Sequence, residues 1–78
     1  MAVLRLFASA REAAGTGRAE LPGETVAAVL EAAREAFGPQ FVAVLPTCRI
    51  WLNGETVDEA TSVGARDEIA VLPPVSGG

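Results

Sequence analysis

The residues with the clearest chemical potential are the last ones, where the chain closes with "LPPVSGG". Gly78 carries an α-carboxylate, which is ionised at neutral pH and is unreactive as an acyl donor until an enzyme converts it to an acyl phosphate-type anhydride. Gly77 and Gly78 present backbone without side chains, so this strip fits a slot too narrow for other residues. We therefore expect a carboxylate that is carried into the active site of another enzyme.

The residues before the two glycines favour the same interpretation. Pro73 and Pro74 lack backbone N–H donors, so they end the preceding strand and stiffen the exit from it. Val75 offers an apolar anchor and Ser76 a hydrogen-bonding group, and residues 73–78 reach at most about 20 Å when extended. The alternative is a frayed terminus without function, which is a common fate of chain ends.

Other candidate chemistry is weakly supported. The chain has no histidine, which removes the usual base of a serine triad, a metal ligand and a proton shuttle. Cys48 is the one cysteine, and one cysteine cannot supply the usual ligand set of a zinc site. It has no histidine or second cysteine nearby in the sequence to lower its pKa, so an inert buried thiol is favoured over a nucleophile. Several carboxyl groups are acid–base candidates, but their spacing favours solvated surface. They are Glu12, Glu20, Glu24, Asp58 and Glu59.

Length and composition limit the partners. With 78 residues, half of them hydrophobic, the chain is expected to form one domain. Ten acidic residues against six arginines give a net charge of −4 without a basic stripe, so we expect no nucleic-acid partner. Arg5 interrupts the short apolar run at the start, and no run reaches membrane-spanning length, so we expect a cytoplasmic protein with no membrane partner.

Hydrophobic periodicity predicts the elements that position the tail. The expected strands are residues 3–7, 18–21, 48–52, 56–57 and 68–72. A stripe of apolar residues from Val26 to Phe37 predicts one amphipathic helix, capped by Thr25 and ended by Gly38 and Pro39. Residues 9–17 are read as a helical turn or loop, and residues 39–46 are left open between helix and loop.

This order predicts an α+β roll, in which a mixed sheet of four to five strands packs on one main helix. Residues 1–72 form the domain, residues 73–78 form a flexible tail, and the first and last strands are expected to be central neighbours. Alternation then places Phe7, Trp51 and Leu72 on the face away from the helix, where exposed apolar groups suit a partner interface. The alternative is that Trp51 folds over the sheet edge or under a loop.

Three segments, "FASAREAAG", "NG" and "DEIAVLPPVSGG", resemble the small sulfur-carrying subunit of molybdopterin synthase. The resemblance extends along essentially the whole chain, and its most specific part is the ending. It implies the ubiquitin-like β-grasp fold. One departure is Arg66 before Asp67 and Glu68, where that family commonly has glycine, so the turn there is expected to be rearranged.

The resemblance also implies a mechanism. An E1-like adenylating enzyme would use ATP and Mg²⁺ to adenylate Gly78, and a sulfur donor enzyme would convert the product to a thiocarboxylate. Pro73, Pro74, Val75, Ser76 and Gly77 would thread the tail into the large synthase subunit, within a complex of two small and two large subunits. The chain would bind no cofactor itself, would not be catalytic alone, and would supply sulfur for the dithiolene of molybdopterin.

Related functions remain open at this stage. Sulfur carriers of thiamine or cysteine biosynthesis share the fold and the Gly-Gly ending, although the Pro-Pro-Val element and the Arg11–Glu12 region point away from the thiamine carrier. A ubiquitin-like protein modifier would share the activation step but transfer the acyl group to an amine.

Overall fold

The computed structural model describes residues 1–74 and consists of one sheet with helices on one side. Its strands are β1 (Ala2–Leu6), β2 (Arg18–Leu21), β3 (Arg49–Leu52), β4 (Glu55–Thr56) and β5 (Glu68–Leu72). Its helices are α1 (Ala8–Ala14), α2 (Val26–Phe37) and α3 (Pro39–Val44), followed by the 3₁₀ turn η1 (Leu45–Thr47). Within residues 1–74, every helix is too short or too polar to cross a lipid bilayer.

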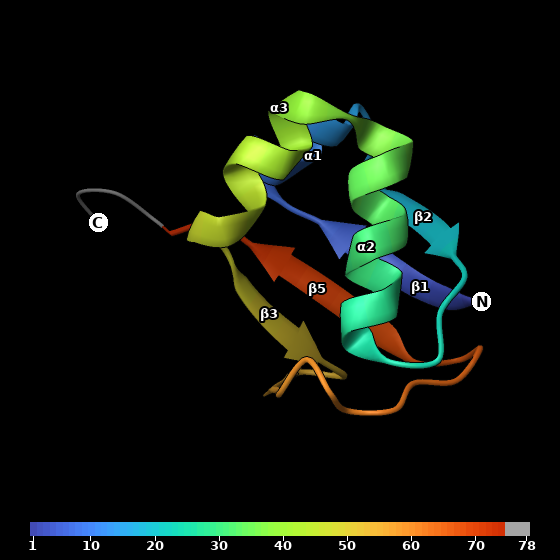
Figure 1. Ribbon diagram of the computed structural model, residues 1–78. Coiled ribbons are helices and arrows are strands. Elements are labelled where there is room, and N and C mark those ends of the chain that lie inside the picture. The colour runs from blue at the N-terminus through green and yellow to red at the C-terminus, as the bar shows by residue number, and fades with distance from the viewer. Residues whose placement is uncertain (75–78) are drawn as a thin grey trace.

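The sheet has five strands in the order β2-β1-β5-β3-β4. β1 and β5 run parallel, and the other three neighbouring pairs are antiparallel. Figure 1 shows α2 lying across one face of this sheet, while α1 and α3 pack together at one end of it. The predicted mixed sheet, with the first and last strands as neighbours under one main helix, is confirmed.

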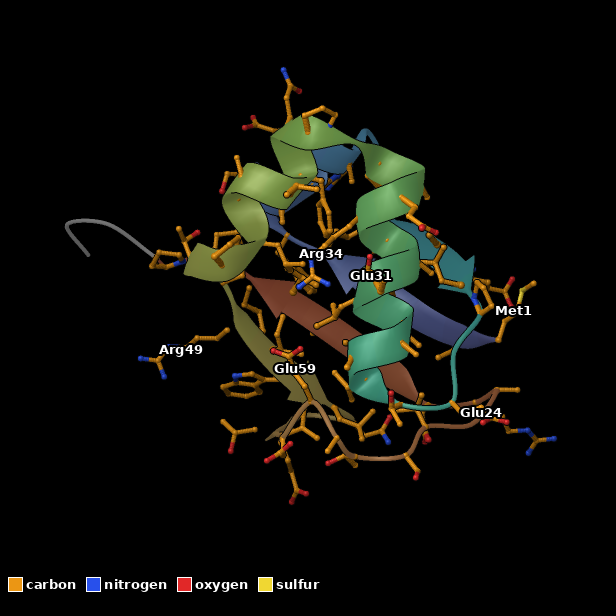
Figure 2. The ribbon with its side chains drawn as sticks, viewed as in Figure 1. Met1, Glu24, Glu31, Arg34, Arg49 and Glu59 are labelled. Atoms are coloured by element: carbon orange, nitrogen blue, oxygen red, sulfur yellow. The ribbon has the colours of Figure 1, made fainter. Side chains whose placement is uncertain are left out.

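Helix α2 forms over the predicted residues, and its sequence explains where it begins. The Oγ1 atom of Thr25 accepts a hydrogen bond of 3.1 Å from the N–H of Ala28, which satisfies one free donor of the first turn. The residues that face the sheet are at most 1% exposed. They are Val26, Val29, Leu30 and Ala33. Figure 2 shows Glu31 and Arg34 on the outer side of the helix, where they form an ion pair of 3.0 Å.

Residues 39–46 are helical, which resolves the alternative that the sequence left open. Pro39 lies in the first turn of α3, where its missing N–H has no helical partner to lose. Phe41 is 0% exposed, and its ring packs edge-to-face on Phe37 with centroids 5.2 Å apart. Burial of this ring explains why the segment folds as a helix against the core rather than as a surface loop.

The inner face of the sheet forms the other half of the core. Its central side chains are at most 2% exposed, and they come from the paired strands β1 and β5. They are Leu4, Leu6, Ile69 and Val71. Ile50 and Leu52 of β3 pack partly buried against the same cluster. The alternation predicted for this face is therefore confirmed.

Residues 8–14 form a regular helix, and this helix shortens the first strand. β1 ends at Leu6 rather than at Phe7, because Phe7 becomes the extended residue before α1, with φ −126° and ψ 152°. Ala8 follows with φ 49°, in the left-handed region that alanine rarely adopts. The chain therefore turns abruptly out of the sheet, and the ring of Phe7 lies beside the strand end.

The bounds of β3 and β4 differ slightly from the prediction. Asn53 and Gly54 have φ 50° and 86°, which is the geometry of a two-residue I′ hairpin, so Leu52 pairs with Glu55 and β4 covers residues 55–56 instead of 56–57. β3 likewise begins at Arg49 rather than at Cys48. Arg66 causes no strain, because Ala8 and Asn53 are the only non-glycine residues with positive φ among residues 1–74.

Candidate functional site

The root of the predicted reactive tail lies at the end of the central strand. β5 is hydrogen-bonded on one side to β1 and on the other to β3, where Arg49 pairs with Leu72. Pro73 is partly buried and Pro74 is exposed. Because neither proline has an N–H donor, neither can extend the ladder, and the chain leaves the sheet at Leu72 as predicted. Val75, Ser76, Gly77 and Gly78 lie outside the described residues, so their roles stay predictions.

Phe7 and Leu72 lie next to each other on the face away from the helices. Leu6 pairs with Val71 on the inner face, so the residues that follow them, Phe7 and Leu72, point to the outer face. The guanidinium carbon of Arg5 lies 5.9 Å from the centre of the Phe7 ring, and Arg5 also belongs to the outer face. The ring of Phe7 is therefore at the tail exit, and Phe7 is 40% exposed.

Trp51 belongs to the same face but offers less surface than the alternation suggested. It pairs with Ala70 of β5, whose neighbour on the other side is Arg5. The residue is only partly exposed, and its Nε1 atom is shielded from solvent and has no hydrogen-bond partner among residues 1–74. Leu72 is partly buried as well. The apolar part of the outer face is thus centred on Phe7, with Trp51 and Leu72 as its partly covered neighbours.

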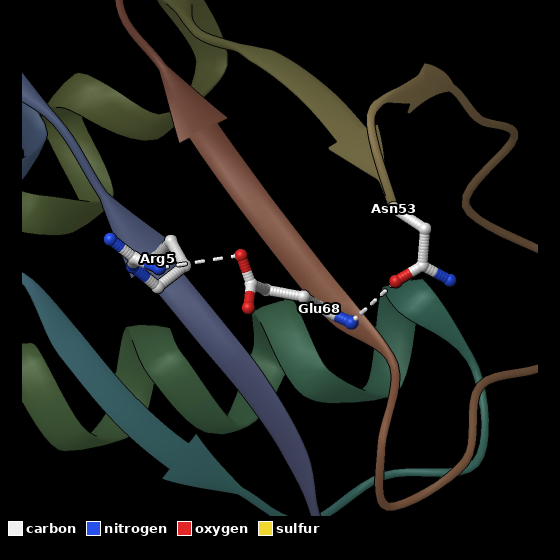
Figure 3. Close-up of polar contacts among 3 residues, drawn as sticks. All are labelled: Arg5, Asn53 and Glu68. Carbon is white, nitrogen blue, oxygen red and sulfur yellow. Dashed lines mark hydrogen bonds and ion pairs between the residues drawn. The ribbon is translucent and has the colours of Figure 1, made fainter.

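Arginines form the part of this face that sequence reasoning missed. The register places Arg5 directly opposite Arg18, and Arg49 opposite Leu72, all on the outer face. Figure 3 shows Arg5 reaching Glu68 on the neighbouring strand, where the two side chains form an ion pair of 3.4 Å. In the sequence these arginines are far apart, and only the strand register brings them together.

Cys48 has the environment of an inert thiol. Its Sγ atom donates a weak hydrogen bond to the carbonyl oxygen of Val44 at 3.4 Å. Burial raises the pKa of the Cys48 thiol, against a smaller opposite effect from Thr47. The thiol is consequently protonated at neutral pH, and the geometry favours a structural role over a nucleophilic one.

The carboxyl groups considered as acid–base candidates do not gather in a cleft. Figure 2 shows Glu24 and Glu59 well apart on different loops, and both are exposed. Asp58 has a local structural role, because its Oδ1 atom accepts a hydrogen bond of 2.8 Å from the N–H of Ala60. Within residues 1–74, no three side chains of histidine, cysteine, aspartate or glutamate come together as a metal site would require.

Asp67 has a carboxyl group with a lowered pKa, and its role is also structural. Its Oδ2 atom accepts a hydrogen bond of 2.7 Å from the N–H of Gly64, and its Oδ1 atom accepts one of 3.1 Å from Asn53. Both bonds lower the pKa of Asp67, and the bond from Gly64 has the larger effect. Asn53 also accepts from the N–H of Glu68 at 3.0 Å, as Figure 3 shows, so the turn before β5 is fixed to the β3–β4 hairpin.

This chain is similar to known proteins along nearly its whole length. A family model described as the ThiS family matches residues 4–78. The fold is similar to that of small archaeal modifier protein 1 from Methanosarcina acetivorans, with 33% identity, a TM-score of 0.88, and coverage of 99% of this chain and 95% of that one. The same protein from Haloferax volcanii shows 32% identity and a TM-score of 0.80, with 97% of each chain covered.

A third similar structure comes from Pyrococcus furiosus and is described as molybdopterin converting factor, subunit 1. It is 25% identical to this chain and has a TM-score of 0.80, with 95% of this chain and 97% of that one covered. The β-grasp architecture predicted from the sequence is therefore shared with all three structures.

Proposed function

Since this chain belongs to the ThiS family, with the fold of a ubiquitin-like sulfur carrier or modifier, we propose that it carries sulfur as a thiocarboxylate on Gly78. The observation that carries the proposal is the placement of the root of the tail. β5 is held between β1 and β3 and ends at Leu72, directly before Pro73 and Pro74. A rigid domain thus delivers a narrow segment, with the carboxylate of Gly78 as its reacting group.

The proposed activation replaces one carboxylate oxygen by sulfur. A carboxylate oxygen of Gly78 attacks the α-phosphorus of ATP in an E1-like adenylating enzyme that uses Mg²⁺, and pyrophosphate leaves. A hydrosulfide equivalent from a sulfur donor enzyme then attacks the acyl carbon, and AMP leaves with the oxygen. The products are the thiocarboxylate, AMP and a proton, so no redox step is required.

This chain contributes the substrate and its presentation rather than the catalyst. Cys48 is protonated at neutral pH, and the carboxyl groups considered above serve turns or lie apart on the surface. These features support a division of labour in which the partner enzymes provide the reacting side chains. The domain holds the root of the tail, and the outer face with Phe7 meets the partner.

For the acceptor we propose the pterin precursor of molybdopterin. The Pro-Pro-Val-Ser-Gly-Gly ending and the similarity to the Pyrococcus furiosus protein support this pathway. The large synthase subunit would receive the tail, in a complex of two small and two large subunits. Each dithiolene contains two sulfur atoms, so two sulfurated carriers are consumed for each molybdopterin formed.

A second candidate is a protein modifier, which the 32–33% identity to small archaeal modifier protein 1 favours. In this case the acyl-adenylate or a thioester derived from it transfers Gly78 to a lysine amine. This chain contains no lysine, so its adducts would form on the lysines of other proteins.

Reconstitution distinguishes the two functions. The sulfurated chain is mixed with the large synthase subunit and cyclic pyranopterin monophosphate, and molybdopterin is quantified as its fluorescent oxidation product. We expect one molybdopterin for every two carriers, and none with the unsulfurated chain. If lysine adducts form in a cell extract while no dithiolene appears, the pathway proposal is wrong and the modifier function is supported.

A further inference from the structure

The outer face of the sheet carries two like charges directly opposite each other. Arg5 of β1 and Arg18 of β2 are register partners in the antiparallel pair. Like charges in this arrangement destabilise a sheet, because their side chains lie on the same face within about 5 Å at Cβ. The protein has a net charge of −4, so placing two arginines together is not a consequence of a surplus of basic residues.

The local compensation for this repulsion is small. Arg5 forms its 3.4 Å ion pair with Glu68, but the two side chains are 42% and 51% exposed, and such surface pairs contribute little. Among residues 1–74, Arg18 forms no ion pair. The backbone of Arg18 is nevertheless held in place, because the hydroxyl of Thr16 donates to the carbonyl oxygen of Arg18 at 3.0 Å and accepts from its N–H at 3.3 Å.

A third arginine approaches the same place from helix α1. A Cβ atom added at Gly17 would lie 3.4 Å from Nε of Arg11 and 3.7 Å from its Cζ, so the guanidinium of Arg11 lies over the turn before β2. Arg5, Phe7, Arg11 and Arg18 line a hollow of about 480 Å³, together with the turn at Thr16 and Gly17. We call this feature the arginine hollow. Glu12 lines a neighbouring hollow, which shares Arg11 and the turn at Thr16 and Gly17 with this one.

The hollow is joined to the tail exit through Phe7. The ring of Phe7 lies under the guanidinium of Arg5, and the backbone N–H of Phe7 donates to the carbonyl oxygen of Val71, 3.3 Å away. The hollow therefore lies at the same end of the sheet as the root of the tail. The three arginines come from β1, the helix α1 and β2, and they line the same hollow.

From this arrangement we propose that the arginine hollow binds carboxylate side chains of the protein that activates the tail, a proposal that rests on the proposed function. Arginine forms bidentate hydrogen bonds with carboxylates, and it is enriched at protein interfaces. The exposed cations offer little to a free phosphate in water, whereas a docking protein excludes water and strengthens each pair. The ring of Phe7 adds an apolar contact beside Arg5.

The test uses Arg18→Glu, because the proposal predicts opposite effects of this change on stability and on binding. Arg5 would then face a carboxylate across the strands, so the thermal midpoint of the isolated protein rises by roughly 2 to 6 °C. The KM of the adenylating enzyme for the carrier rises about tenfold or more at low salt, since repulsion replaces attraction at the interface. The kcat at saturating carrier stays unchanged, because Gly78 itself is intact.

Two controls separate charge at the hollow from charge in general. Arg66→Glu makes the same change in net charge at an exposed turn away from the hollow, and it leaves KM within about twofold at ordinary ionic strength. Raising the salt from about 0.05 M to about 0.5 M reduces the tenfold effect of Arg18→Glu to about threefold or less, because exposed charges are screened.

Three results would overturn the proposal. The first is an equal rise in KM for Arg66→Glu and Arg18→Glu, and the second is an unchanged KM for Arg18→Glu. The third is saturable binding of inorganic phosphate or ATP to the isolated chain below about 1 mM, followed by the NMR signals of the arginine Nε–H groups, which would show a small-anion site. If the wild-type chain is not adenylated at all, the proposed function fails instead, and the two failures are thus distinguishable.

Discussion

The backbone N–H of Phe7 donates to the carbonyl oxygen of Val71 across 3.3 Å, one residue before β5 ends. This bond joins the end of the first strand to the end of the last one. It places an exposed aromatic ring beside the root of the predicted reactive tail, and both are fixed by the same rigid sheet. The proposed partner of the tail would therefore meet Phe7 in a defined orientation.

Deleting Gly78 is predicted to abolish thiocarboxylate formation while leaving the fold intact. The buried core residues of the described part of the chain lie between Ala2 and Val71, so we expect the free energy of unfolding to change by less than about 0.5 kcal/mol. Ile69→Ala is the matched control for a core change and costs about 2–5 kcal/mol, because Ile69 is wholly buried. Urea denaturation measures both changes, and a loss on deletion as large as that of Ile69→Ala would contradict the prediction.

Phe7→Asp is predicted to weaken binding of the large synthase subunit about tenfold or more, as expected for removal of a central aromatic contact. The fold should tolerate the change, because the ring is 40% exposed and aspartate suits the residue before a helix. Val42→Asp provides the control, since Val42 is 42% exposed on α3. Calorimetric titration of both variants decides: equal affinities would show that the partner face lies elsewhere.

Gly23→Ala is predicted to destabilise the protein by about 2 kcal/mol or more, because the added Cβ atom clashes with the backbone of α2. A Cβ atom at Gly23 would lie 2.7 Å from the backbone nitrogen of Val29, and the residue has φ 147°. Gly64→Ala is the control, because the nearest atom there, Oδ2 of Asp67, would be 3.8 Å away. Thermal unfolding of the two variants should differ clearly, and equal midpoints would refute the close packing at Gly23.

Protonation of Asp67 is predicted to cause part of the loss of thermal stability at low pH. Hydrogen bonds from Gly64 and Asn53 hold the pKa of the folded carboxyl below its ordinary value of 3.8. The stabilisation is therefore present above that value and is lost as the pH falls through the lower, folded pKa. Between about pH 5 and pH 2, the thermal midpoint of Asp67→Asn should fall less than that of the wild type, from a lower starting value.

Glu35→Gln serves as the control for Asp67→Asn, because Glu35 is an exposed carboxyl of α2. Its pH profile should follow the wild type. Coincident profiles for all three proteins would show that the turn before β5 contributes nothing to acid sensitivity.

The sequence predicted the elements whose evidence is local. The helix from Val26 to Phe37 has a capping threonine, an apolar stripe and a terminating glycine, so its bounds follow from the chain alone. Residues 39–46 stayed open because the decisive contact, between Phe41 and the core, joins distant parts of the chain. β1 ended one residue early because Phe7 and Ala8 turn sharply into α1, which the periodicity of the strand does not reveal.

The candidate site was predictable only in part, for a related reason. The tail stands out as a sequence motif, and alternation correctly placed Phe7 on the outer face. The strand register and the turn at Gly17 bring Arg5, Arg11 and Arg18 together, and the local sequence predicts neither of them. Arginines that are far apart in the sequence therefore form one charged surface.

The most direct test of the central claim is the intact mass of the chain after incubation with the adenylating enzyme, ATP, Mg²⁺ and the sulfur donor. Sulfur carriage predicts a gain of about 16 Da, the difference between sulfur and oxygen, located on the C-terminal peptide and absent without ATP. An unchanged mass, in a reaction where a known carrier of the same enzyme is sulfurated, would contradict sulfur carriage by Gly78.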